Sequence, residues 1–119
     1  MGTGADYKDL LVWQKAMDLA SSVYEITRKL PKEELYSLGD QMRRAAVSIP
    51  SNIAEGKARN SDKEFNYFLG ISKGSCAELE TQLLLAERVG YLKHEEIENV
   101  LSLLTEIRKI VSVFQKKLN

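Results

Sequence analysis

A seam of apolar residues spaced alternately four and three positions apart runs through the second half of the chain and most constrains its fold. Between residues 61 and 89 the seam consists of Phe65, Leu69, Ser72, Cys76, Leu79, Leu83 and Ala86, and between 94 and 118 of Ile97, Val100, Leu104, Ile107, Val111, Phe114 and Leu118. A mean repeat of 3.5 residues is typical of α-helices that pack nearly parallel, at about 20°. No segment shows the sustained alternation of a strand. We therefore expect an all-α fold.

The first half of the chain predicts two more helices. Residues 9–30 carry the stripe Trp13, Met17, Ala20, Tyr24, Thr27 and Leu30, and residues 37–55 the stripe Leu38, Met42, Ala45, Ile49 and Ile53. Pro31 should end the first helix, because the residue before a proline is pushed out of the α region. We expect Ser37 to cap the second helix and Gly56 to end it in a left-handed conformation. Pro50 inside this helix predicts a kink.

The third and fourth helices have clear boundaries. Ser61 followed by Glu64 fits a capping box, and Gly90 follows the last turn of the third helix. The fourth helix spans 94–118. All connections are short, which forces neighbouring helices to run antiparallel. The prediction is one domain, 9–119, folded as an up-down-up-down four-helix bundle behind a flexible N-terminus, 1–8.

Apolar residues off the main seams indicate a second buried face. Ile71, Leu84 and Leu85 lie on the third helix, and Leu103, Ile110 and Val113 on the fourth. Some of them can simply widen the core-facing stripe. So many on the two longest helices nevertheless favour self-association, with an oligomer interface at Ile71, Leu84, Leu103, Ile110 and Val113.

Residue types that carry catalysis are few. The single histidine, His94, excludes a di-iron site built from two Glu-x-x-His pairs, and the single cysteine, Cys76, lies on an apolar seam. We expect no enzyme activity, no cofactor, no metal and no small-molecule substrate. With neither a secretory signal nor an apolar run long enough to span a membrane, the chain is predicted to be cytoplasmic.

The charges balance in total but not in arrangement. Lys+Arg and Asp+Glu both number 17. In an up-down bundle, the end that gathers the start of the first helix, the 55–61 turn and the end of the fourth helix carries nine basic and six acidic residues. The opposite end carries five basic and eight acidic residues. A side-by-side ring would align the basic ends for polyanion binding; helix-terminal charge preference alone is the other explanation.

One run has a specific family likeness. Residues 43–56, RRAAVSIPSNIAEG, together with the opening DLLVWQKA at 9–16, the ELETQL run at 78–83 and GYL at 90–92, resemble the four-helix-bundle proteins of the 23S rRNA intervening-sequence (S23) family. The resemblance covers nearly the whole chain from Asp6. That family is similar to the accessory variability protein of diversity-generating retroelements, a basic homopentameric barrel that binds nucleic acid and partners a reverse transcriptase.

The resemblance implies a homopentamer that binds RNA, DNA or a ribonucleoprotein. Candidate nucleic-acid-binding residues are Arg43 and Arg44 within the motif and Lys57, Arg59 and Lys63 beyond it. Arg43 and Arg44 could equally form salt bridges between subunits. The alternative function is an oligomeric protein–protein adaptor with no nucleic-acid role.

Overall fold

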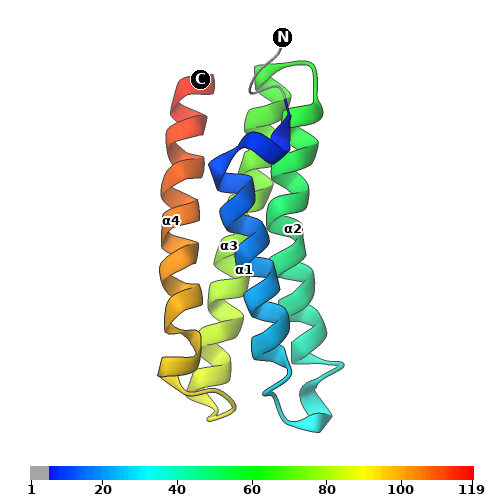
Figure 1. The fold of residues 1–119 in the computed structure, drawn as a ribbon, viewed down its shortest axis with the longest axis vertical. Coiled ribbons are helices and arrows are strands. Elements are labelled where there is room, and N and C mark those ends of the chain that lie inside the picture. The colour runs from blue at the N-terminus through cyan, green and yellow to red at the C-terminus, as the bar shows by residue number, and fades with distance from the viewer. Residues whose placement is uncertain (1–5) are drawn as a thin grey trace.

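The structure, a computed structural model, describes residues 6–119 as four long helices lying side by side (Figure 1). They are α1 (Leu11–Thr27), α2 (Leu38–Ala58), α3 (Asp62–Arg88) and α4 (His94–Leu118), with short 3-10 helices η1 (Tyr7–Asp9) and η2 (Lys32–Glu34). α1 contacts α2 and α4, and α3 contacts the same two helices. The molecule measures 48 × 21 × 19 Å. The predicted antiparallel up-down-up-down bundle is confirmed.

The core follows the predicted seams on three of the four helices. Every seam residue of α3 is buried, as are Ile97, Val100, Leu104, Ile107 and Val111 on α4 and Met42, Ala45, Ile49 and Ile53 on α2. Phe114 and Leu118, near the end of α4, pack against this core while remaining partly exposed. The 3.5-residue repeat therefore identified the buried faces correctly where helices pack along their full length.

The stripe predicted for α1 is correct at Ala20, Thr27 and Leu30 but wrong at Met17 and Tyr24. The buried residues are Val12, Ala16, Leu19, Ala20, Val23, Ile26, Thr27 and Leu30. Met17 and Tyr24, predicted to be core, are each nearly half exposed, at 46% and 45%. A shift of one residue rotates the buried face by about 100°. α1 thus carries a second apolar stripe that its own bundle does not bury.

Two predicted helix ends also differ. Ser37 does not cap α2, because its hydroxyl donates instead to Glu34 Oε1 at 3.0 Å. Gly56 does not end α2 in a left-handed conformation, and the helix continues to Ala58. A Cβ at Gly56 would lie only 2.8 Å from Phe68 Cβ, so this glycine permits close approach of α2 and α3.

The remaining boundaries agree more closely. Ser61 Oγ accepts from the backbone N–H of Glu64 at 3.2 Å, and Gly90 has φ 85°. α1 ends at Thr27, three residues before the predicted end, in a turn whose N–H groups donate three residues back, ahead of Pro31. The buried Pro50 lies within the continuous α2, where the kink stays a prediction.

The structure describes the chain from Asp6, within the segment 1–8 whose flexibility stays a prediction. Residues 1–5 lie outside the described part of the chain. Tyr7 begins η1, which Asp6 caps through its carboxylate, and its ring packs edge-on against Trp13 with 5.4 Å between centroids. This aromatic pair holds the start of the described chain against α1.

Candidate nucleic-acid interface

Arg43, the first arginine of the RRAA motif, is committed to contacts within the chain. Its guanidinium donates to Thr27 Oγ1 at 3.0 Å and to the Leu35 carbonyl at 2.7 Å, and it forms an ion pair with Asp40. These acceptors come from the end of α1, the α1–α2 connection and α2 itself. Only 21% of the Arg43 side chain is exposed, and its guanidinium links these three segments. We call this set of contacts the Arg43 clamp.

Arg44 has a different environment although it is the next residue. It is exposed, and no carboxylate of residues 6–119 lies within ion-pair distance of it. It borders a surface hollow of about 470 Å³ together with Tyr24, Val47 and Ser48. The two motif arginines therefore line one hollow, but only Arg44 has its guanidinium available to a phosphate.

The polar residues of the motif join α2 to α3. Ser48 Oγ lies 2.8 Å from Ser75 Oγ of α3, and within α2 Asn52 Nδ2 donates to the Ser48 carbonyl at 2.8 Å. Ser72 Oγ donates to the Ile49 carbonyl at 2.9 Å in the buried interface. Together with the close approach at Gly56, these bonds show that much of the motif serves helix packing.

The structure brings Lys57, Arg59 and Lys63 together at the α2–α3 turn. Arg59 is held by Glu55 at 2.7 Å and by Glu64 at 3.6 Å. Neither lysine has a carboxylate of the described chain within 4 Å, while Lys57 Nζ lies 5.9 Å from the centre of the Phe65 ring. These three predicted site residues therefore form one cluster, which is separate from Arg43 and Arg44.

The same end of the bundle receives the end of α4 (Figure 1). Asn66 Nδ2 donates to Asn119 Oδ1 at 3.2 Å, which ties the last residue of the chain to α3. Lys109, Lys116 and Lys117 of α4 are exposed, and among residues 6–119 they too have no carboxylate partner at ion-pair distance. We call Lys57, Lys63, Lys109, Lys116 and Lys117 the free-lysine group.

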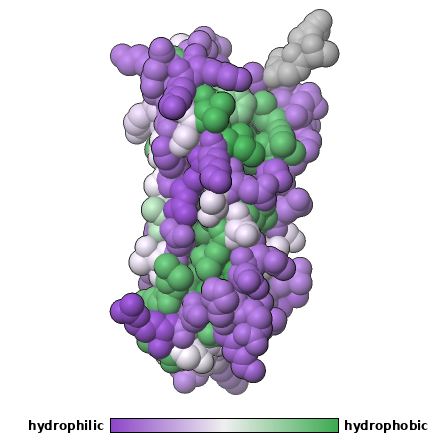
Figure 2. Space-filling model, turned by 90° about the vertical axis from the view of Figure 1, so that its left-hand side faces the viewer, coloured by the Kyte–Doolittle hydropathy of each residue, from purple (hydrophilic) through white to green (hydrophobic). Residues whose placement is uncertain are grey.

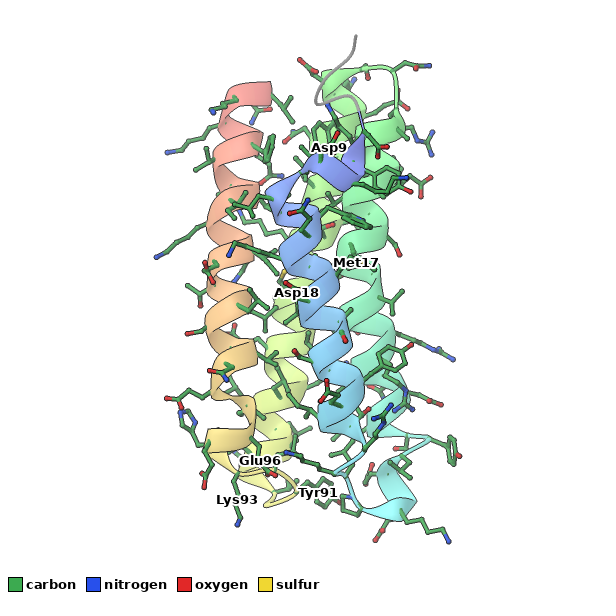
Figure 3. All side chains as sticks on the ribbon, in the orientation of Figure 1. Asp9, Met17, Asp18, Tyr91, Lys93 and Glu96 are labelled. Atoms are coloured by element: carbon green, nitrogen blue, oxygen red, sulfur yellow. The ribbon has the colours of Figure 1, made fainter. Side chains whose placement is uncertain are left out.

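At the opposite end of the bundle, two acidic residues, Glu34 and Glu96, accept hydrogen bonds from residues of the α3–α4 loop. Tyr91 Oη donates to Glu34 Oε2 at 3.2 Å, and this bond raises the pKa of Tyr91. The backbone N–H of Lys93 donates to Glu96 at 2.8 Å and lowers the pKa of that carboxyl. Figure 3 shows Tyr91, Lys93 and Glu96 gathered at this end.

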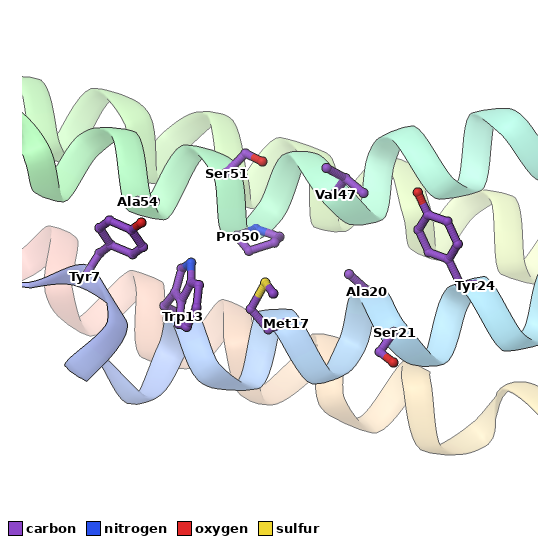
Figure 4. Close-up of a pocket in the computed structure, with 10 residues that line it drawn as sticks. All are labelled: Tyr7, Trp13, Met17, Ala20, Ser21, Tyr24, Val47, Pro50, Ser51 and Ala54. Carbon is purple, nitrogen blue, oxygen red and sulfur yellow. The ribbon is translucent and has the colours of Figure 1, made fainter.

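An apolar groove separates α1 from α2 along the unburied stripe of α1. Trp13, Met17, Tyr24, Val47 and Pro50 line it with Tyr7, Ala20, Ser21, Ser51 and Ala54, around a volume of about 450 Å³ (Figure 4). Figure 4 shows Trp13 and Met17 pointing from α1 toward Pro50 of α2. The sequence predicts Trp13, Met17 and Tyr24 as part of the core stripe of α1, whereas the structure places them along the groove.

The predicted interface residues divide into two kinds. Leu84 and Val113 are about half exposed and Ile71 is 36% exposed, whereas Leu103 and Ile110 are partly buried against the core. Figure 2, which views the side where α4 lies, shows hydrophobic surface as separate patches among hydrophilic side chains. Leu103 and Ile110 therefore widen the core stripe of α4, while Ile71, Leu84 and Val113 remain at the surface.

The groups with catalytic potential lie apart. Burial raises the pKa of Cys76 to about 11, so its thiol is protonated at neutral pH. His94 lies at the surface at the start of α4, with Nδ1 3.3 Å from Glu87. Residues 6–119 contain no group of three His, Cys, Asp or Glu side chains placed to hold a metal. No described helix is long and apolar enough to cross a membrane.

These features define a small four-helix-bundle protein whose distinctive residues lie on its surfaces and at its helix contacts. The chain matches the family model for the 23S rRNA-intervening sequence protein over residues 8–113, and it belongs to that family. It is similar to the crystal structure of a protein of unknown function from the S23 ribosomal protein family of Bacteroides thetaiotaomicron. The TM-score is 0.83 with 26% identity, covering 89% of this chain and 99% of that one. No curated protein matches the chain.

Proposed function

We propose that the chain is a non-enzymatic, cytoplasmic subunit of a homo-oligomeric ring that binds nucleic acid at one end of the bundle. The free-lysine group carries this proposal. Four of its five cations, Lys57, Lys63, Lys116 and Lys117, lie at the end that holds the α2–α3 turn and the end of α4, while Lys109 lies farther back along α4; none has a carboxylate partner among the described residues. Such cations release counterions from a polyanion when they contact its phosphates.

Ring assembly would concentrate positive charge on one rim, which a single neutral subunit cannot do. The whole chain has 17 basic and 17 acidic residues, so a single subunit has no long-range attraction for phosphate. Subunits arranged side by side around a symmetry axis present the same end in the same direction, and the free-lysine group is then repeated around one rim. A homopentamer, which the family resemblance implies, would repeat it five times.

Titration of a fluorescent structured RNA with micromolar protein tests nucleic-acid binding. We expect affinity that falls steeply between about 50 and 200 mM salt, because each phosphate contact adds to the slope. A control variant with Lys32→Gln and Lys93→Gln, at the acidic end, should bind like the parent. Absence of salt-sensitive binding at micromolar protein would overturn the proposal.

Light scattering tests the ring. The α1–α2 groove and the exposed leucines of α3 are unlike surfaces on one subunit, and contacts between unlike surfaces generate rings. We expect Met17→Glu and Leu84→Glu each to reduce the measured mass toward the 13.5 kDa of one chain with an unchanged helical signal. Ser102→Glu, an exposed position on α4, is the control. A parent that already has the mass of one chain would refute ring assembly.

The groove also favours a second candidate, an oligomeric adaptor for another protein. A groove lined by Trp13, Met17 and Pro50 suits the apolar face of a helix. A stoichiometric protein partner that remains bound to the native complex after nuclease treatment, and is lost in Met17→Glu, would favour this function over nucleic-acid binding.

A further inference from the structure

Tyr67 is an exposed aromatic residue at the candidate nucleic-acid interface. It lies on α3 one turn after Lys63, and 65% of its surface is exposed. Its ring meets Phe68 edge-on, with 5.2 Å between the centroids. Neither ring is part of the α3 seam, so packing within the bundle does not require an aromatic side chain at position 67.

Arg59 braces this aromatic pair. Its guanidinium carbon lies 4.8 Å from the centre of the Phe68 ring, and the guanidinium also pairs with Glu55 and Glu64. Arg59, Lys63, Glu64, Tyr67 and Phe68 together line a surface hollow of about 530 Å³. The hollow therefore combines the exposed ring of Tyr67, the ring of Phe68 at its edge and a lysine with no carboxylate partner among the described residues.

Charge alone does not explain this hollow. Its neighbourhood holds three cations, Lys57, Arg59 and Lys63, and three anions, Glu55, Asp62 and Glu64. Beyond the phosphate contacts of the two lysines, the exposed ring of Tyr67 offers the face of a nucleobase a stacking surface, and this contribution does not depend on the local charge. The ligand chemistry that fits best is a flat aromatic base next to one phosphate.

We propose that unpaired nucleobases stack on Tyr67, with Lys63 contacting the adjoining phosphate. The inference rests on the proposed nucleic-acid function and narrows its ligand to single-stranded segments. A duplex hides the faces of its bases, so only an unpaired base can reach a ring on the protein surface. RNA and DNA share this chemistry, since every base has a π-face.

Fluorescence anisotropy on the intact protein tests the proposal with a single-stranded RNA 15-mer, the DNA of the same sequence, and an RNA hairpin stem. We expect Tyr67→Ala to weaken binding of both single strands by about 5-fold to 100-fold, the range typical of base–aromatic stacking. Tyr67→Phe keeps the ring and should bind within about twofold of the parent. The stem should lose no more than about twofold in either variant. Thermal melts of the three proteins establish that each is folded.

The outcomes separate the two proposals. Parent protein that binds neither single strand nor stem overturns both. Salt-sensitive binding that Tyr67→Ala leaves unchanged, or weakens equally for stem and single strand, overturns stacking and leaves the proposed function standing. A loss confined to RNA also overturns stacking, because it indicates a 2′-hydroxyl contact. A 5-iodouridine oligonucleotide should photocrosslink to Tyr67; a crosslink mapped elsewhere contradicts the proposal.

Discussion

Replacing Arg43 by alanine should destabilise the fold, although a motif arginine on a nucleic-acid-binding protein would ordinarily be read as a phosphate contact. The side chain donates to Thr27 Oγ1 and to the Leu35 carbonyl, and it pairs with Asp40. Hydrogen bonds from a charged donor contribute about 1.5–3 kcal/mol each, and a partly exposed ion pair contributes about 1 kcal/mol or less. Since 21% of the side chain is exposed, we discount the two bonds to a total of about 2–4 kcal/mol.

Urea denaturation followed by circular dichroism measures this loss. With a slope of about 1.5 kcal/mol per molar urea for a chain of this size, the midpoint should fall by about 1.3–2.7 M. Arg43→Lys should recover little, because one ammonium cannot reproduce the planar fork that spans three acceptors. Arg44→Ala is the matched control and should remain within about 0.5 kcal/mol of the parent. Equal free energies of unfolding for Arg43→Ala and Arg44→Ala would refute the clamp.

Three further predictions concern the bundle. Gly56→Ala should destabilise the fold by more than about 1 kcal/mol, because the added Cβ would lie 2.8 Å from Phe68 of α3. Gly74→Ala should stabilise the fold by about 0.5–1 kcal/mol, because its added Cβ has no atom within 4 Å. Thermal melts that rank the two variants the other way would contradict this packing. The hydrogen bond from Arg108 lowers the pKa of Glu80 in the folded protein below its usual 4.5. The pair therefore stabilises the fold above about pH 4.5, and this stabilisation is lost as the pH falls through the pKa of Glu80 in the folded protein. Acid titration of Glu80→Gln should therefore show a shallower loss of stability than the parent. With its pKa at about 11, Cys76 should react with a thiol reagent at pH 8 only after denaturation, and rapid native labelling would contradict its burial.

The buried face of a helix could be predicted from the sequence where its apolar residues form one main stripe. On α3 and α4 a single stripe repeats every 3.5 residues, and it is the buried one. α1 carries two adjacent stripes with the same spacing, one through Val12 and Leu19 and the other through Trp13 and Met17. Periodicity cannot choose between two apolar stripes; only the positions of α2 and α4 decide which one is buried.

The candidate site was only partly predictable for a similar reason. Clustering of Lys57, Arg59 and Lys63 follows from a short turn between two helices. The role of Arg43 depends on acceptors in three separate segments, which no local pattern reveals. Tyr67 could have been noticed as an aromatic residue two positions from the seam residue Phe65, and thus directed away from the core.

The most direct test of the account compares the two ends of the bundle in one experiment. RNA affinity is measured at low salt for the parent, for Lys63→Gln with Lys116→Gln, and for Lys32→Gln with Lys93→Gln. Both double variants remove two positive charges, so only position differs. We expect the first pair to weaken binding at least about tenfold and to lower the salt slope by about 2, and the second pair to change neither. Equal losses from the two ends would contradict this expectation.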